Sequence, residues 1–482
     1  MKYLIFFISI FTLNLKAGEL DPFRASIRSN HQITLLNQGL ASLEERLQMI
    51  EKAQKSIAVE YFIYNLDKSG RIFSQALIKK AREGVKVRML LDYFMVKGQF
   101  SPFFAYEMEK NGIEVKYFNA TSTLNLFGGQ YRNHRKLLLI DGKEAITGGR
   151  NIGDEYFDLH EKFNFLDRDI LVSGPIVSSI QNTFDQVWNA DISVKVERDR
   201  MPQADDGVYR IENNDYDEFR YSNDLKHYNQ EVTKAVEFLS VPNNLLLEEI
   251  RAKGKAELAT EYSGICERMS FNSEYPIIGK KNRAERIIKH DLAGRIRNAK
   301  ESILFDSPYF IVDDASTFAL DYALENKVKV TLLTNSLNST DAIYVYASFD
   351  SNIKNWIKKG LDTYIFKGNL PENYATMTDE ISHARFGVHA KSFVFDKKDV
   401  VIGTYNFDPR SANLNVEMTL SCDNNPKLAG IVTEDIEARM RGSIFLDSNK
   451  TVDDFQFYNT SFLKRIGYYL YKIPSNLFDY LL

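Results

Sequence analysis

Cysteine is almost absent from this chain of 482 residues, which contains two, Cys266 and Cys422. Two cysteines cannot form a disulfide framework or a cysteine-based metal cluster. They could form a single bridge, but two unpaired, small apolar side chains are the expected state. The chain also lacks a strong charge of either sign, because 61 basic residues nearly balance 65 acidic ones. That balance disfavours a dedicated nucleic-acid binder, which would usually be basic.

The apolar run at the N-terminus is too short for a comfortable transmembrane helix, which needs about 20 residues. Lys2 precedes the run from Tyr3 to Leu15, and Ala17 offers a cleavage site. This order is typical of a signal peptide, here over residues 1–17. Leu15 is an unusual residue at the third position before the cut, so an uncleaved anchor is the alternative. We therefore expect an exported, periplasmic protein that associates peripherally with a membrane surface.

One short motif occurs twice in the chain. The two copies of His-x-Lys-x4-Asp are His134, Lys136 and Asp141, and His389, Lys391 and Asp396. Each copy is followed by a glycine-containing turn and an asparagine, Asn151 or Asn406. Because strand side chains alternate, a His and a Lys two residues apart point to the same face. Two such faces would surround one anion with two imidazoles and two ammonium groups, which suits a phosphodiester.

An internal repeat surrounds these motifs. Residues 50–64 resemble residues 296–310, and each segment is typical of a helix that runs into a buried strand. Residues 84–92 and 327–335 form the next similar pair, each a β-branched strand after a helix. Strands that alternate with helices predict an α/β fold. The repeated order predicts two pseudo-symmetric lobes, each a mixed, mostly parallel sheet flanked by helices, with the active site at the lobe interface.

We expect five parts along the chain. They are a signal peptide (1–17), a first lobe (30–200), a linker with short helices (201–280), a second lobe (281–445) and an amphipathic aromatic tail (455–482). The tail combines aromatic and aliphatic residues with Lys464, Arg465 and Lys472. This composition suits the headgroup level of a bilayer. A helix that covers a flank of the second lobe is the alternative.

The paired motif resembles that of the phospholipase D superfamily. Residues 61–64, 84–88, 148–157 and 406–411 are similar to bacterial cardiolipin synthases, in the subgroup without two N-terminal transmembrane helices. The similarity spans most of residues 32–441. It implies a bacterial enzyme that moves a phosphatidyl group between phospholipids through a phospho-histidine intermediate, without a cofactor or metal. An exported phospholipase D or a metal-independent nuclease is the alternative, because spacing alone indicates only phosphodiester transfer.

The resemblance also implies roles for the histidines and their partners. His134 is the expected nucleophile and His389 the expected general acid, with the opposite assignment left open. A histidine nucleophile needs a group that fixes its tautomer. Glu417 stands where family members place an acidic residue against the second-motif histidine. Asp167 is the expected first-lobe counterpart, with Asp169 as the alternative.

The remaining motif residues should contact the phosphate or support the fold. The expected phosphate ligands are Lys136 and Lys391, with hydrogen bonds added by Asn151 and Asn406. Asp141 and Asp396 complete the catalytic motifs, and we expect them to act structurally by holding the turn at the strand end. The aromatic loop from Phe94 to Phe104 favours phospholipids and a membrane surface as partners.

Overall fold

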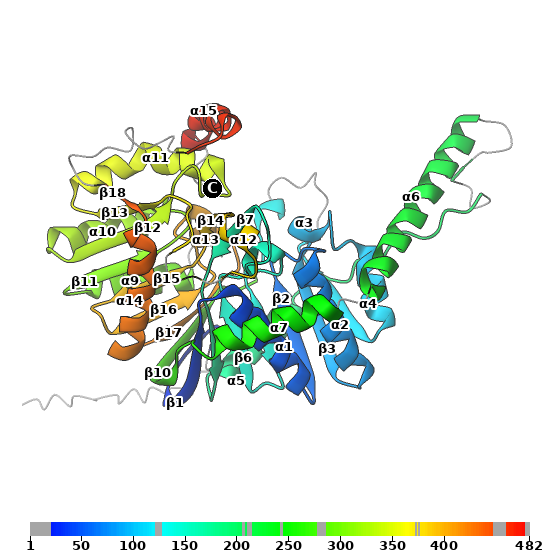
Figure 1. Ribbon diagram of the computed structural model, residues 1–482, viewed down its shortest axis with the longest axis horizontal. Helices are drawn as coiled ribbons and strands as arrows, with labels where there is room; N and C mark the ends of the chain where they lie inside the picture. Colours follow the sequence, from blue (N-terminus) through cyan, green and yellow to red (C-terminus); the bar gives the residue numbers. More distant parts are fainter. Residues whose placement is uncertain are drawn as a thin grey trace, which may run out of the picture.

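The computed structural model describes residues 21–120, 128–204, 208–209, 215–241, 244–276, 286–371, 374, 376–446 and 459–477. The predicted signal peptide lies outside the described residues, as do parts of the predicted linker and tail. Figure 1 shows two α/β lobes side by side, the first in blue to cyan and the second in yellow-green to orange.

The first lobe contains strands and helices in alternation. They are β1 (Arg24–Leu36), α1 (Gly39–Lys52), β2 (Ser56–Tyr61), α2 (Lys68–Arg82), β3 (Lys86–Asp92), α3 (Tyr93–Val96), α4 (Pro102–Lys110), β4 (Ile113–Phe118), β5 (Leu137–Ile140), β6 (Glu144–Gly148), β7 (Phe163–Leu166), β8 (Asp169–Ser173), α5 (Val177–Asn189) and β9 (Ser193–Val194). Two helices follow, α6 (Asp215–Ser240) and α7 (Asn244–Leu258). In Figure 1, α6 projects from the body of the molecule.

The second lobe repeats the order of the strands in the large sheet. Its elements are β10 (Ser263–Ser273), α9 (Ile287–Asn298), β11 (Ser302–Asp306), α10 (Asp314–Glu325), β12 (Lys329–Asn335), α11 (Ile343–Lys358), β13 (Asp362–Phe366), α12 (Asp379–Ser382), β14 (Arg385–Val388), β15 (Ser392–Phe395), β16 (Asp399–Gly403), α13 (Pro409–Asn413), β17 (Met418–Cys422), α14 (Pro426–Arg441) and β18 (Ile444–Leu446). However, β14 precedes β15 and β16, whereas β7 follows β5 and β6. The last described helix, α15 (Phe462–Leu477), packs along α11. No helix in the described part of the chain combines the length and apolarity needed to cross a bilayer.

One sheet joins the lobes. Its 16 strands, among the described residues, run β18-β13-β12-β11-β15-β16-β17-β10-β1-β8-β6-β5-β2-β3-β4-β9. Outward from the antiparallel pair β1–β10, every strand of one lobe has its counterpart in the other. The prediction of two pseudo-symmetric lobes with mixed sheets is confirmed. We predicted mostly parallel sheets, but fewer strands are parallel than antiparallel. In the large sheet only β2, β3 and β4, and β11, β12 and β13, pair in parallel among the described residues.

Helices bury both faces of the sheet, so its central strands are apolar almost throughout. On one face, separate cores form in the two lobes under the helices that follow β1 and β10. On the other face, α5 and α14 pack on a core that continues across β1, β10 and β17. This shared core fixes the two lobes as one body.

Strand β10 was not predicted. We assigned residues 201–280 to a linker with short helices, but the structure places residues 263–273 in the sheet between β1 and β17. Only part of this strand alternates: Cys266, Met269 and Phe271 are buried, while Ile265 is exposed. The weak alternation hid the strand, which is the second-lobe equivalent of β1.

The cysteines also differ from our expectation. We predicted two unpaired side chains, but Cys266 and Cys422 form a disulfide across the neighbouring strands β10 and β17, with a Cα–Cα distance of 5.9 Å. The two residues are 156 positions apart in the chain. Their contact depends on a strand pairing that the sequence did not indicate.

Candidate active site

His134 is held in place by a backbone contact between the lobes. Its amide donates to the Val416 carbonyl at 2.9 Å, beside a parallel bridge between Asn133 and Val416. The next residue, Glu417, faces the imidazole, and its Oε2 lies 2.9 Å from His134 Nδ1. Both side chains are buried. The first-motif histidine is therefore fixed by a carboxylate of the opposite lobe.

His389 is held by the equivalent contact. Strand β14 of the second lobe pairs in parallel with β7 of the first, and the His389 amide donates to the Leu166 carbonyl at 2.9 Å. Asp167 follows Leu166, and its Oδ2 lies 2.5 Å from His389 Nδ1. The second-motif histidine is thus fixed by a carboxylate of the first lobe.

This pairing corrects our expectation. We placed Glu417 beside His389 and made Asp167 the partner of His134, whereas the structure crosses the two pairs. The alternative, Asp169, instead accepts hydrogen bonds from buried side chains of the first lobe. Each histidine segment bonds to the backbone of the other lobe, and spacing within one lobe carries no information about that contact.

Glu417 is the more heavily hydrogen-bonded carboxylate. Besides His134, it accepts from Thr404 Oγ1 at 2.5 Å, Ser411 Oγ at 2.8 Å and Asn415 Nδ2 at 3.1 Å. Burial opposes its charge, but the contact with His134 and the bond from Thr404 help to outweigh burial, so the pKa of Glu417 is lowered. The carboxylate is therefore a fixed anion.

Asp167 lies against a turn that has no space for a side chain. A Cβ on Gly149 would lie 1.9 Å from Asp167 Oδ1, and that oxygen accepts from the Arg168 amide at 2.8 Å. Burial opposes the charge of Asp167, but the contact with His389 outweighs it, and the pKa of Asp167 is lowered. Thr404 is the second-lobe equivalent of Gly149. The turn after each motif therefore shapes the site of one carboxylate.

The carboxylates determine which imidazole nitrogen is available for chemistry. A carboxylate beside Nδ1 favours the tautomer with its proton there, which leaves Nε2 as the reactive nitrogen. Burial lowers the pKa of His134 to about 4, against the opposing effect of Glu417. Burial also lowers the pKa of His389, and Lys391 adds to that effect. An anion bound beside the two imidazoles would raise their pKa values and favour their protonated forms.

The motif lysines are buried beside their own histidines. Lys136 Nζ donates to the His134 carbonyl at 2.7 Å, while Lys391 Nζ donates to the His389 carbonyl and lies 2.9 Å from His389 Nδ1. Burial lowers the pKa of Lys136 well below its ordinary value and that of Lys391 to about 8. A phosphate anion between them would favour their charged forms.

Asn151 and Asn406 both line the cleft but differ in their contacts. Asn151 Oδ1 accepts from the Ile63 amide at 3.1 Å, so its oxygen holds a first-lobe loop. Asn406 Oδ1 is buried without a hydrogen-bond partner in the part of the chain that the structure describes. Of the two predicted asparagines, Asn406 is therefore the one with a buried oxygen left without a hydrogen bond among the described residues.

The motif aspartates lie away from the cleft. Asp141 accepts from the amides of Gln54, Lys55 and Ser56 at 2.7–3.0 Å, at the turn that enters β2. Asp396 accepts from the amides of residues 300–302 at 2.8–3.2 Å, at the turn that enters β11. These contacts support a structural role for both residues.

The histidines line one cleft of about 660 Å³ between the lobes. It lies beyond the carboxyl ends of the parallel strands, where α/β sheets bind ligands. Its walls combine aromatic and charged side chains from both lobes: Phe62, Phe94, Lys97, Arg132, Tyr309, Asp341, Tyr344, Asp408 and Arg410. Burial raises the pKa of Asp408 to about 7. The cleft can therefore surround an anion while its walls offer apolar and acidic contacts.

Several of these wall residues were missed by the sequence analysis. Arg132 stands two positions before His134, and that spacing could have suggested a shared face. Asp341 follows β12, where the carboxyl-end rule predicts ligand contacts. Asp408 and Arg410 lie in a segment that we used for the resemblance without giving them a role.

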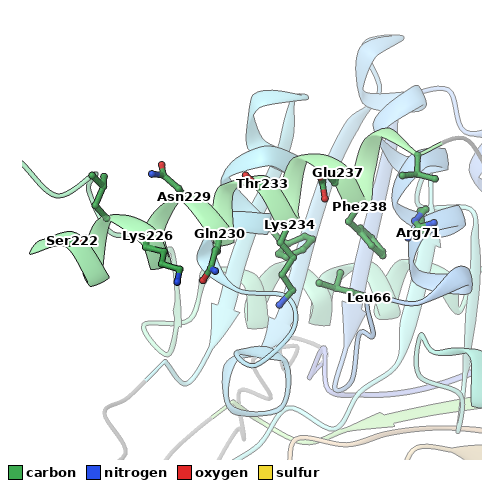
Figure 2. A pocket seen from close by; sticks show the side chains of 13 residues that line it. Leu66, Arg71, Ser222, Lys226, Asn229, Gln230, Thr233, Lys234, Glu237 and Phe238 are labelled. Carbon is green, nitrogen blue, oxygen red and sulfur yellow. The ribbon is translucent and has the colours of Figure 1, made fainter. Parts of the chain in front are cut away.

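A larger hollow, of about 870 Å³, lies elsewhere. Figure 2 shows it along α6, with Lys234 and Phe238 beside Leu66 and Arg71 of the first lobe and Lys226 further along the helix. None of the motif residues lines it. The chemistry therefore belongs to the cleft between the lobes.

The duplicated motif, meeting across one interface of this fold, places the protein among enzymes of the phospholipase D type. A family described as cardiolipin synthase, PLD-like domain matches residues 47–188 and 292–440. The chain belongs to this family.

Known relatives extend over most of the chain. Cardiolipin synthase C of Escherichia coli (strain K12) is 29% identical over 80% of this chain and 79% of its own. The major cardiolipin synthase ClsA of Bacillus subtilis (strain 168) is 29% identical over 82% of this chain and 66% of its own. The crystal structure of phosphatidylserine synthase from Haemophilus influenzae Rd KW20 has a TM-score of 0.63 at 13% identity, covering 93% of this chain and 95% of that one. That structure supports the fold.

Proposed function

We propose that this protein is a phosphatidyltransferase that moves a phosphatidyl group from one phospholipid to a hydroxyl of another, as the names of its cardiolipin synthase relatives indicate. The observation that carries the proposal is the crossed pair His134–Glu417 and His389–Asp167. Each carboxylate contacts Nδ1, so both imidazoles can present Nε2 to one phosphodiester. Such a pair can divide nucleophilic and acid catalysis between its members.

In the first step, His134 Nε2 attacks phosphorus while the bond from phosphorus to the headgroup oxygen breaks. The leaving alkoxide takes the proton from His389 Nε2, which the bound anion has made easier to protonate. A phosphatidyl group is then attached to His134, and its Nδ1 proton remains hydrogen-bonded to Glu417. The positive charge on the substituted imidazole is balanced by this buried carboxylate.

In the second step, the hydroxyl of an acceptor phospholipid enters the position left by the headgroup. His389 Nε2 takes its proton as the oxygen attacks phosphorus, and the phosphorus–nitrogen bond to His134 breaks. The enzyme returns to its starting protonation state. Water in the acceptor position would give phosphatidic acid by the same steps, so exclusion of water decides between transfer and hydrolysis.

Lys136 and Lys391 neutralise the phosphate oxygens in this scheme, because their buried amines regain full charge beside an anion. Asn406 supplies a polar group with an unused oxygen. The oxygen can accept a hydrogen bond from an acceptor hydroxyl. These groups stabilise charge that develops at phosphorus and at the two oxygens in line with it.

The walls of the cleft favour a lipid over a nucleic acid. Phe94, Tyr309 and Tyr344 give it an apolar rim, and the acidic side chains Asp341 and Asp408 interrupt its positive charge. A nucleic-acid groove would follow the backbone with basic residues. We also propose that the protein is exported, because the Cys266–Cys422 disulfide suits an oxidising compartment.

The test is a lipid assay with purified protein on mixed phosphatidylglycerol and phosphatidylethanolamine vesicles, with products resolved by mass spectrometry. Cardiolipin should form, and His134→Ala and His389→Ala should each abolish it. His290→Ala, a change of an exposed histidine on α9, is the matched control and should retain activity. Phosphatidic acid as the sole product would make the protein a hydrolase, and unchanged lipids would refute the proposal.

A further inference from the structure

Helix α15 leaves a broad apolar face exposed. Its anchoring side is buried, with Tyr468 fully covered and its hydroxyl 2.5 Å from Asp350 of α11. The opposite side exposes Leu463 at 78% and Leu470 at 69% of their surfaces. A helix that only covers the flank of a lobe would turn its large apolar residues inward. Helix α15 packs one apolar side against the second lobe and exposes another apolar side to solvent.

The same helix is fastened to the wall of the cleft. Lys464 Nζ donates to the carbonyls of Leu337, Asn338 and Thr340 at 2.7–3.0 Å. This loop continues directly into Asp341, which lines the cleft. Further along, the ring of Tyr471 contacts that of Tyr344, another cleft residue, with centroids 6.3 Å apart. The helix therefore rests on a loop and a side chain that form the wall of the cleft.

The first lobe contributes apolar groups to the mouth of the cleft. Phe94 and Met95 of α3 line the cleft and are also exposed, Phe94 at 52%. Arg132 and Lys97 lie over the Phe94 ring at 4.8 and 4.7 Å, so cations border this tip. In Figure 1, α3 and α15 lie on the same side of the molecule, on opposite sides of the lobe interface.

We propose that these residues form one docking surface for a bilayer of anionic phospholipids, which holds the mouth of the cleft against the membrane. This rim surface consists of Phe462, Leu463, Ile466, Tyr469 and Leu470 on α15 with Phe94 and Met95 on α3. It deepens the proposed function by giving the lipid substrate its direction of entry.

Charge favours this occupant. Besides Lys464, whose amine is bound to the loop carbonyls, helix α15 carries Arg465 and Lys472 and no acidic residue over residues 462–477. Lys472 also lies 3.5 Å from Asp350 of α11. Apolar and aromatic side chains beside lysine and arginine are the composition of helices that lie at the headgroup level. A phosphodiester at that depth can reach the histidines while its acyl chains stay in the bilayer. Docking by both lobes would also place acceptor and donor lipids at one mouth.

The test compares vesicle binding with chemistry on a soluble substrate. The full chain carrying Leu463→Ser and Leu470→Ser is sedimented with phosphatidylglycerol–phosphatidylcholine vesicles, and its hydrolysis of a monomeric p-nitrophenyl phosphodiester is measured alongside. Both leucines are exposed, so folding should be unchanged, as circular dichroism can verify. Phe318→Ser on α10 removes an equally exposed side chain, at 64%, away from the rim surface and is the matched control.

We expect the double variant to lose vesicle affinity by about tenfold or more while its rate on the monomeric substrate is unchanged. The control should match the parent in both assays. A Leu470→Trp variant should shift its emission to the blue on vesicles, and Phe318→Trp should not.

Vesicle binding equal to the parent would overturn the docking surface. Self-association that depends on the two leucines, without vesicle binding, would assign the face to a second copy of the chain and also overturn it. The binding assay needs no turnover. An enzyme that binds vesicles through these leucines but makes no lipid product would therefore refute the proposed function and retain the docking surface.

Discussion

The crossed pairing of histidines and carboxylates makes an unusual prediction about Glu417→Gln and Asp167→Asn. Each change removes one negative charge while keeping the size of the side chain. Glu417 touches His134, so its replacement should slow attack on phosphorus. Asp167 touches His389, so its replacement should slow protonation of the leaving group. The two variants should therefore fail at different steps.

The magnitude follows from the contact that is lost. A hydrogen bond to a charged group contributes about 1.5–3 kcal/mol. At about 1.4 kcal/mol for each factor of ten, that range predicts a loss of about 10- to 150-fold in rate. The loss would be larger if the amide also stabilised the wrong tautomer, as in serine proteases, where the corresponding change costs about 10⁴-fold.

The assay varies the leaving group. Release of p-nitrophenol from a nitrophenyl phosphodiester needs no general acid, whereas release of glycerol from phosphatidylglycerol does. In the first-turnover burst of nitrophenol, before His389 is needed as the base of the second step, Glu417→Gln should be slower by the full 10- to 150-fold, and Asp167→Asn should stay within a few-fold of the parent. Glu44→Gln changes a buried carboxylate that binds Arg251 outside the cleft and controls for loss of stability.

One result would refute this reasoning. If Asp167→Asn lost its rate on the nitrophenyl substrate while Glu417→Gln kept it, His389 would be the nucleophile. Equal losses of both variants on both substrates would show that the carboxylates act on the site as a unit.

Three further predictions follow from the pKa values and the structural contacts. The value of kcat/KM should rise as the pH increases through about 4, where His134 of the free enzyme loses its proton, and fall as the pH rises through the lowered pKa of His389, which must be protonated to act as the acid. It should fall further above about 8, where Lys391 becomes neutral. A rising limb near 6.5 would contradict the effect of burial on His134. Asp396→Ala should lower the unfolding free energy by about 1–3 kcal/mol in denaturant titrations, because three amides lose their acceptor. The pKa of the Asp396 carboxyl is lowered in the folded state, so the carboxylate stabilises the fold at any pH above the pKa that it has in the unfolded chain. This stabilisation is lost as the pH falls through the pKa of the folded state. Replacing both cysteines, Cys266→Ser with Cys422→Ser, should lower the unfolding free energy by about 5 kcal/mol, because the disulfide closes a loop of 156 residues, and kcat should be unchanged. An equal denaturation midpoint for the reduced and the oxidised protein would show that no disulfide forms.

The fold could be predicted where local pattern and repetition agree. Buried strands such as β2 and β11 are apolar runs between amphipathic helices, and their repetition indicated two lobes. Strand β10 escaped because its apolar positions alternate only in part, and the Cys266–Cys422 disulfide escaped with it. Long-range pairing supplies the stability that a weak local pattern lacks.

The chemical groups of the site could be listed from the sequence: two histidines, two lysines and the acids that follow them. The predicted strand placement of each His and Lys was wrong, because β5 begins at Leu137 and β15 at Ser392, just after the two motif pairs. Which acid contacts which histidine depends on how the two lobes pack together. Asn133 meets Val416, and β14 meets β7, so each histidine is oriented by the opposite lobe. These partners are hundreds of residues apart, and the contact is set by the packing of two lobes on a shared core rather than by any periodicity within one of them.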